Sequence, residues 1–214
     1  MTDSYLTLAR GGEAEIEVKR SRFLCTLARV EDEGAARAVV DRLRKQHFDA
    51  RHHCSAFVLG PDGAVERSSD DGEPAGTAGA PMLEVLRGRE VSDVVAVVTR
   101  WFGGTLLGAG GLVRAYGDAV RAGLDATGTL RRDRVRELTL ELGHADAGRV
   151  ESELRARGVT VLDTVYAATV TLRLGVPPAE LDRLHALVAE LTGGTATAHP
   201  AGERWVDRPD GRSA

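Results

Sequence analysis

The stretch SDVVAVVTRWFGGTLLGAGGLVRAY, residues 92 to 116, decides the fold because it joins a strand pattern to a helix pattern through glycines. Residues 92–102 form a continuous run rich in β-branched side chains, which predicts a strand buried on both faces at the centre of a sheet. The apolar positions that follow, from about residue 111 to 126, recur at helical spacing and predict an amphipathic helix.

The glycine-rich run between this strand and this helix is the first candidate site. A buried strand that leads through glycines into a helix exposes backbone N–H groups at the positive end of the helix dipole, where an anion such as phosphate can bind. The run is not a P-loop, and it misses the third glycine of the dinucleotide-binding fingerprint. The other interpretation is that the glycines only permit tight turns and close packing. The candidate phosphate or nucleic-acid contacts are Arg20, Arg22, Arg100, Gly103, Gly104, Gly108, Gly110, Gly111 and Arg114.

Outward from this stretch, the preceding residues predict two further strands and two helices. Residues 14–30 and 54–60 read as strands. A helix is predicted over 33–47 with Asp32 as its N-cap, and a short helix over 81–88.

The pattern changes after an Arg-rich joint at residues 131–136. The order strand, helix, strand, strand, helix and a weak last strand near residues 202–206 predicts a ferredoxin-like βαββαβ unit. We therefore predict an α+β protein with domains at residues 1–130 and 134–207 and a disordered tail at 208–214.

Composition limits the function. The chain has 214 residues, and its formal net charge of −4 excludes a uniformly basic nucleic-acid coat, although local basic patches remain compatible with it. Its two cysteines, Cys25 and Cys54, form no CxxC pair and no disulfide framework, which favours a reducing compartment. The N-terminus has no apolar signal region, so we expect a cytoplasmic protein.

The second candidate is the loop SSDDGEPAGTAGAPM, residues 68 to 82. Asp70, Asp71 and Glu73 offer oxygen ligands for magnesium or a general base. Asp, Gly and Pro are also the residues that build turns, so the favoured interpretation is a rigid recognition turn. This recognition loop comprises Ser69, Asp70, Asp71, Gly72, Glu73, Pro74, Gly76 and Thr77.

The third candidate is ARHHCSA, residues 50 to 56, whose His53 is a weak catalytic candidate. On a strand, His52 and Cys54 face one side and His53 the other. A zinc site would need further ligands, and none lies at metal spacing, so no metal site is predicted.

The motifs together resemble the YigZ/IMPACT family. The resemblance rests on ARHHCSAFVLG (50–60), SSDDGEPAGTAGAPML (68–83), VVAVVTRWFGGTLLGAGGLVRAYGDAV (94–120) and KRSRF (19–23). It implies an N-terminal α/β domain similar to the second domain of a small-subunit ribosomal protein, to domain IV of elongation factor G and to the GHMP kinases. It also implies a C-terminal half similar to the ferredoxin-like domains of elongation factor G. One position departs from the family, which commonly has a lysine where this chain has Ala80.

The resemblance also suggests a function. Eukaryotic relatives are translational regulators that compete for an activator of a stress-responsive initiation-factor kinase, whereas the bacterial members have no settled activity. The leading hypothesis is therefore a translation-associated regulatory module without cofactor that binds RNA, the ribosome or a protein partner, with no membrane association and no DNA specificity. The alternative is a small phosphotransferase or hydrolase in which the Gly-rich loop holds phosphate and the acidic loop supplies a base or binds Mg²⁺.

Overall fold

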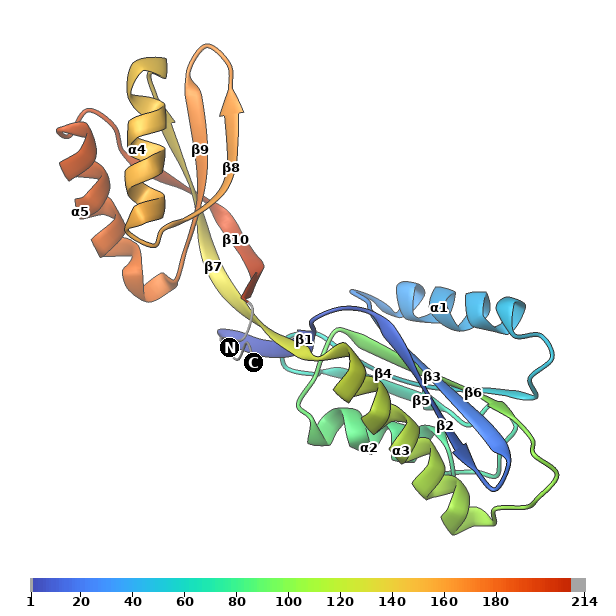
Figure 1. Ribbon diagram of the computed structural model, residues 1–214. Helices are drawn as coiled ribbons and strands as arrows, with labels where there is room; N and C mark the ends of the chain where they lie inside the picture. The colour runs from blue at the N-terminus through green and yellow to red at the C-terminus, as the bar shows by residue number, and fades with distance from the viewer. Residues whose placement is uncertain (1, 209–214) are drawn as a thin grey trace. The chain divides into compact units, whose positions relative to one another are not determined.

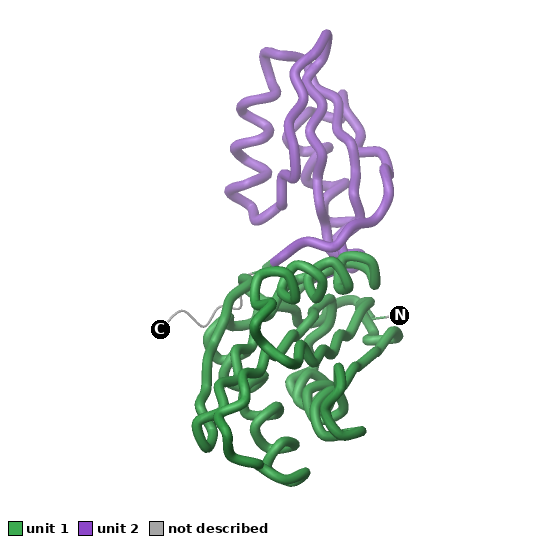
Figure 2. Tube along the Cα trace, turned by 90° about the vertical axis from the view of Figure 1, so that its right-hand side faces the viewer, with its two compact units in different colours: residues 1–132, 208–214 green, residues 133–207 purple. Residues whose placement is uncertain are grey.

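The computed structural model describes residues 2–208, and it divides into two compact units (Figures 1 and 2). Unit 1 extends to Arg132 and unit 2 comprises Asp133–Asp207, so the division lies between the predicted domains 1–130 and 134–207. The tail predicted to be disordered lies, from residue 209 onward, outside the described residues.

Unit 1 contains an antiparallel sheet with the order β2-β3-β6-β4-β5. The strand predicted to be central is central, because β6 lies between β3 and β4. The strands are β2 (Gly12–Val18), β3 (Ser21–Arg29), β4 (His52–Leu59), β5 (Val65–Ser69) and β6 (Val94–Trp101).

Both faces of β6 are covered by helices, as its unbroken apolar sequence predicts (Figure 1). Helices α2 (Gly79–Gly88) and α3 (Ala109–Thr127) pack on the face to which Val94, Ala96 and Val98 point. Helix α1 (Glu33–Gln46) packs on the other face, against Val95 and Val97.

The helix boundaries follow from local hydrogen bonds. Asp32 caps α1 as predicted, since its side chain accepts a hydrogen bond from the Ala35 N–H at 2.7 Å. The predicted starts of the other two helices were two residues late, because α2 begins at Gly79 and α3 at Ala109. The prediction also missed strands β1 (Ser4–Leu8) and β5, which are short and partly exposed.

Unit 2 has the predicted element order β-α-β-β-α-β, with sheet order β10-β7-β9-β8. Its likeness to domains of elongation factor G, and that of unit 1 to domain IV and the ribosomal protein, stay predictions. The elements are β7 (Thr129–Leu142), α4 (His144–Ala156), β8 (Thr160–Tyr166), β9 (Val170–Val176), the short helix η1 (Pro178–Glu180), α5 (Leu181–Thr192) and β10 (Ala198–Arg208).

The Arg-rich joint predicted at residues 131–136 contains the boundary between the two units, after Arg132, but it does not interrupt the secondary structure, because these residues lie inside strand β7. Arg134 and Arg136 both form ion pairs with Glu203 of β10, at 3.4 and 2.5 Å. Opposite charges on neighbouring strands stabilise a sheet, so this polar run stays in the strand.

Candidate functional site

Asp70 shapes the recognition loop from within. Its carboxylate accepts hydrogen bonds from the backbone N–H groups of Gly76 at 2.8 Å, Ala78 at 3.0 Å and Gly79 at 2.8 Å. Partial burial raises the pKa of Asp70, but the three N–H donors outweigh it and hold the pKa below its usual value. The Asp70 carboxylate is therefore occupied at the start of α2 and stabilises the turn.

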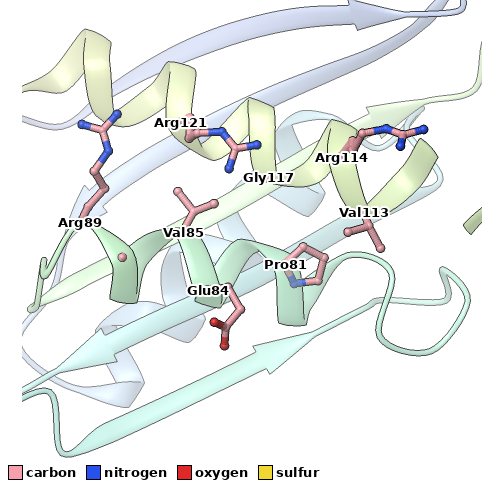
Figure 3. Close-up of a pocket in the computed structure, with 9 residues that line it drawn as sticks. Pro81, Glu84, Val85, Arg89, Val113, Arg114, Gly117 and Arg121 are labelled. Carbon is pink, nitrogen blue, oxygen red and sulfur yellow. The ribbon is translucent and has the colours of Figure 1, made fainter. Parts of the chain in front are cut away.

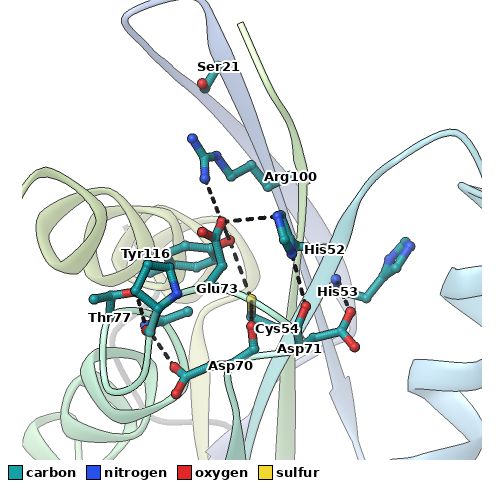
Figure 4. A network of polar contacts seen from close by, with 12 residues as sticks. Ser21, His52, His53, Cys54, Asp70, Asp71, Glu73, Thr77, Arg100 and Tyr116 are labelled. Carbon is teal, nitrogen blue, oxygen red and sulfur yellow. Dashed lines mark hydrogen bonds and ion pairs between the residues drawn. The ribbon is translucent and has the colours of Figure 1, made fainter. Parts of the chain in front are cut away.

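Asp71 ties the same loop to β4, as Figure 4 shows, and also to α1. Its carboxylate accepts a hydrogen bond from the His53 N–H at 2.6 Å and forms an ion pair with Arg44. Its carbonyl oxygen accepts a hydrogen bond from Nδ1 of His52 at 2.9 Å. Asp71 adopts a left-handed backbone conformation with φ of 43°, which costs energy that these contacts offset.

Glu73 points into the protein and forms the centre of a buried network (Figure 4). Its side chain is only 4% exposed, and Oε1 lies 2.5 Å from Nη1 of Arg100. The Tyr116 hydroxyl donates a hydrogen bond to the same oxygen at 2.7 Å. Nε2 of His52 lies 3.9 Å from it.

The network continues to Cys54. Its sulfur lies 3.0 Å from the Asp70 carbonyl oxygen and 3.3 Å from the Tyr116 hydroxyl, so the single thiol proton has two acceptors within reach. Burial raises the pKa of Cys54 to about 12, and burial also raises the pKa of Tyr116, with Cys54 and Glu73 adding to the effect. Both groups therefore stay protonated at neutral pH.

The weak catalytic candidates all have structural partners. The carboxylates of Asp70, Asp71 and Glu73 accept the hydrogen bonds and ion pairs given above. His53 is buried, with Nδ1 3.1 Å from the Thr99 hydroxyl, and burial lowers its pKa. Within residues 2–208, no group of three His, Cys, Asp or Glu side chains is placed to hold a metal ion.

Arg100, predicted as a surface contact to phosphate, is buried. Its guanidinium carbon lies 5.3 Å from the ring centre of Phe23 and 5.7 Å from that of Phe102. Glu73 binds one of its nitrogens, but its Nε has no hydrogen-bond partner among the described residues. Arg100 therefore helps to form a wall of the site rather than its outer surface.

Two of the predicted glycines are required by the backbone. A Cβ on Gly103 would lie 2.0 Å from the carbonyl carbon of Arg20, so a side chain cannot fit there. The Gly103 N–H donates to the Ser21 hydroxyl at 3.1 Å, which fixes the loop against the β2-β3 turn. Gly104 has a φ of 83° and serves a tight turn.

The start of α3 has no side-chain cap, and the anion site predicted there stays a prediction. Its N-cap is Gly108, which offers no side-chain acceptor, and the Leu112 N–H is the first to bond, to the Gly108 carbonyl at 3.0 Å. The N–H groups of Ala109, Gly110 and Gly111 have no partner within the part of the chain that the structure describes. This leaves the positive end of the helix dipole uncapped.

The recognition loop and the Gly-rich loop meet at a cavity of about 450 Å³. From the first loop come Glu73 and Pro74, and from the second come Gly108 and Ala109. The remaining walls are Arg51, His52, Arg100, Phe102, Leu106, Leu107 and Leu112. Two motifs that are far apart in sequence thus form one site.

Other predicted contacts lie elsewhere. Arg22 pairs with Glu15 at 2.7 Å, and Arg20 donates to the Thr105 hydroxyl at 3.0 Å. Arg114 lines a second cavity, of about 480 Å³, between α2 and α3, together with Arg89 and Arg121 (Figure 3). Ala80, at the position where the resemblance implies a lysine, is exposed in the first turn of α2 and lines neither cavity.

Sequence reasoning missed several residues of this site. Tyr116 lies in the helix predicted from about residue 111 to 126, where the sequence indicates an apolar face and gives no sign of a buried hydroxyl that donates to Glu73. Arg51, Phe102 and Leu106 lie inside the quoted motifs, but nothing in the sequence singles out their side chains. Their grouping around the cavity is a property of the fold.

Comparison with known proteins covers both units. Residues 19–124 match the Impact N-terminal domain, and residues 140–195 match a domain of unknown function, DUF1949. The chain is 42% identical to the IMPACT family member YvyE of Bacillus subtilis, over 91% of this chain and 89% of the relative. It is also 42% identical to the IMPACT family member YigZ of Escherichia coli, over 84% of this chain and 89% of the relative.

Two further relatives extend the comparison. A protein IMPACT homolog of Saccharomyces cerevisiae is 36% identical over 50% of this chain and 44% of its own length. A crystal structure of a hypothetical protein, 39% identical, aligns with a TM-score of 0.63 over 94% of this chain and 98% of that chain. Across both of its units, the chain belongs to the IMPACT family.

Proposed function

We propose that this protein regulates translation by binding a protein of the translation machinery, through the cavity where the recognition loop meets the start of α3. This proposal rests on one observation: the carboxylates of the recognition loop bind other groups of the protein itself. Asp70, Asp71 and Glu73 hold the loop in shape through hydrogen bonds and ion pairs. An acidic loop whose charges are used internally is suited to recognition rather than to acid-base chemistry.

A protein partner is better supported than RNA. Phosphate binding needs free cations, but many arginines of unit 1 already pair with carboxylates, and the net charge of the chain is −4. The cavity instead has apolar groups at its surface, since Phe102 is 43% and Leu106 83% exposed. Exposed apolar groups around a cavity are typical of protein-binding sites. The paired arginines are Arg22, Arg44, Arg87, Arg89 and Arg121.

Family membership supports the translational part of the proposal. The yeast relative named IMPACT aligns with half of this chain. The family resemblance implies translational regulation in eukaryotic members, and this is the reason to look for the partner in the translation machinery.

Sedimentation with purified ribosomes tests this function. We expect the protein to sediment with ribosomes or ribosome-bound factors at moderate salt, and an excess of bulk RNA not to displace it. Displacement by RNA together with a steep loss of binding on adding salt would support the RNA version instead. No association with ribosomes or with purified translation factors would contradict the translational role.

One observation favours an enzyme as the second candidate. Glu73 and Arg100 are buried beside Tyr116 and both line the cavity, and buried charged groups in a cavity are common in active sites. A phosphotransferase or hydrolase would bind nucleotide with Mg²⁺ there. Thermal unfolding with and without nucleotide and Mg²⁺ distinguishes the two, because a ligand of the folded state raises the melting temperature. Stabilisation by nucleotide with Mg²⁺ would favour the enzyme, and an unchanged melting temperature would favour the binding module.

A further inference from the structure

We propose that the cavity binds the free C-terminal carboxylate of a peptide that ends in an apolar residue. The inference rests on the proposed function, because it names the part of the protein partner that the cavity would recognise. The carboxylate would lie at the start of α3, and the last side chain would lie against the leucines of the cavity.

The positive groups for a carboxylate come from two independent parts of the site. The uncapped N-terminus of α3 leaves the N–H groups of Ala109, Gly110 and Gly111 without partners among the described residues. Arg100 lines the same cavity, its side chain is 7% exposed, and its buried Nε has no partner among those residues. The positive charge of Arg100 therefore lies at the wall of the same cavity as the start of α3.

Arg51 adds a third positive group at the surface. It is exposed, lines the cavity and has no partner in the described part of the chain. It can therefore pair with an incoming anion without breaking an existing contact. Capture of a C-terminal carboxylate by backbone N–H groups and a nearby cation is a known mode of peptide recognition.

The remaining walls favour an apolar side chain next to the carboxylate. Leu106, Leu107 and Leu112 line the cavity with Phe102 and Pro74. The volume of about 450 Å³ lies in the range of small-ligand sites. Leu106 is 83% exposed, so a bound apolar side chain would remove that surface from water.

The number of unpaired charges favours a carboxylate over a phosphate. Glu73 pairs with Arg100, so Arg51 is the one arginine lining the cavity that has no carboxylate partner among the described residues. This single cation matches a carboxylate, which carries one negative charge, whereas a phosphate monoester near neutral pH carries up to two. The aliphatic walls also offer few hydrogen-bonding groups to a nucleobase.

The test is an NMR titration of the full chain with N-acetyl-glycyl-glycyl-leucine as the free acid and as its C-terminal amide. We expect the acid to bind saturably, with shifts of the amide resonances of Ala109, Gly110 and Gly111, and the amide to bind at least tenfold more weakly. N-acetyl-triglycine should also bind more weakly, because it has no apolar side chain.

A variant that adds a negative charge to the cavity should block binding, and the same change at another helix is its control. Ala109 is exposed and lines the cavity at the first position of α3, so Ala109→Asp adds a carboxylate there. Acidic residues in the first turn suit the helix dipole, so the fold should be kept, and an unchanged NMR spectrum away from the site checks this. Ala145→Asp makes the same change in the first turn of α4. We expect Ala109→Asp to abolish binding and Ala145→Asp to leave it unchanged.

Three outcomes would overturn the inference. They are equal binding of acid and amide, tighter binding of a nucleoside monophosphate than of the peptide acid, and no shifts with the acid at about 10 mM, a concentration that detects even weak complexes. The proposed function fails separately, if the protein binds the peptide acid but associates with neither ribosomes nor translation factors. Association with ribosomes without peptide binding would refute only this inference.

Discussion

Oε1 of Glu73 lies 2.5 Å from Nη1 of Arg100, and the two side chains are 4% and 7% exposed. The ion pair connects the recognition loop to the central strand β6, because Arg100 lies near the end of that strand. Removing two charges from water is costly, so such a pair contributes little net stability, but a single unpaired charge in its place is strongly destabilising.

Removal of Glu73 alone should therefore destabilise unit 1 strongly. We expect Glu73→Leu to lower the free energy of unfolding by about 3–5 kcal/mol, because it leaves the Arg100 charge buried without its partner. Chemical denaturation followed by fluorescence measures this in a Trp205→Phe background, in which the signal comes from Trp101 of unit 1.

The double variant is the control for that prediction. Glu73→Leu with Arg100→Met removes both charges, and the loss should be smaller than in Glu73→Leu alone. If Glu73→Leu alone proved as stable as the wild type, Glu73 would not be the partner that compensates the Arg100 charge.

Asp70 should stabilise the protein through the three backbone N–H groups that it binds. We expect Asp70→Ala to cost about 1–3 kcal/mol, since loss of the carboxylate leaves the loop and the start of α2 without their acceptor. Asp62→Ala, in an exposed turn of the same unit, is the matched control and should change stability little. Equal effects of the two substitutions would refute the role of Asp70.

The contribution of Asp70 should also depend on pH. Its pKa is lower in the folded protein than in the unfolded chain, so the unfolded state takes up a proton first as the pH falls. The stabilisation is complete above the ordinary Asp pKa of about 3.9 and is lost as the pH falls through the lower folded value. Denaturation at several pH values measures this. The free energy of unfolding should fall less steeply with decreasing pH in Asp70→Ala than in the wild type, and equal slopes for the two proteins would contradict the prediction.

Gly103 should tolerate no side chain. A Cβ there would lie 2.0 Å from the Arg20 carbonyl carbon, so Gly103→Ala forces the Gly-rich loop away from the β2-β3 turn. We expect a loss of about 1–3 kcal/mol or more. Gly148→Ala in α4 is the contrast, because nothing lies within 4 Å of its Cβ and alanine favours a helix by about 0.5–1 kcal/mol. Thermal unfolding of both variants should show shifts in opposite directions.

The two cysteines should react slowly in the folded protein. Burial raises the pKa of Cys25 and that of Cys54 to about 12, and the thiolate is the reactive form. Labelling with a thiol reagent at pH 8 should be slow in native protein and fast for both residues in denaturant. Rapid labelling of Cys54 in the native state would show that the network around Tyr116 opens to solvent.

The sequence predicted the layers of the fold better than the site. The β-branched run of β6 and the spacing of apolar residues in α1 and α3 carry their own signals, because periodicity reports burial directly. The charged run at residues 131–136 contains the boundary between the two units, but the sequence did not show that it forms part of strand β7, since the carboxylate that pairs with its arginines belongs to Glu203, far along the chain.

The candidate site could not be predicted in full without knowing which side chains pair in the folded protein. The glycines pointed correctly to a strand-to-helix turn with free N–H groups. Arg100 was expected at the surface, but its pairing with Glu73 depends on a loop that folds back from another part of the chain. Arg100→Glu would place two carboxylates in one buried space, so it would test folding rather than binding. Ala109→Asp reaches the same cavity without disturbing that pair.

The measurement that tests the central claim most directly is co-sedimentation with ribosomes of the wild type, Ala109→Asp and Ala145→Asp, with purified translation factors present. The account predicts that the wild type and Ala145→Asp sediment alike, in the presence of competing RNA, and that Ala109→Asp stays in the supernatant while keeping its thermal stability. Equal sedimentation of all three proteins would show that the cavity at the start of α3 is not the binding site.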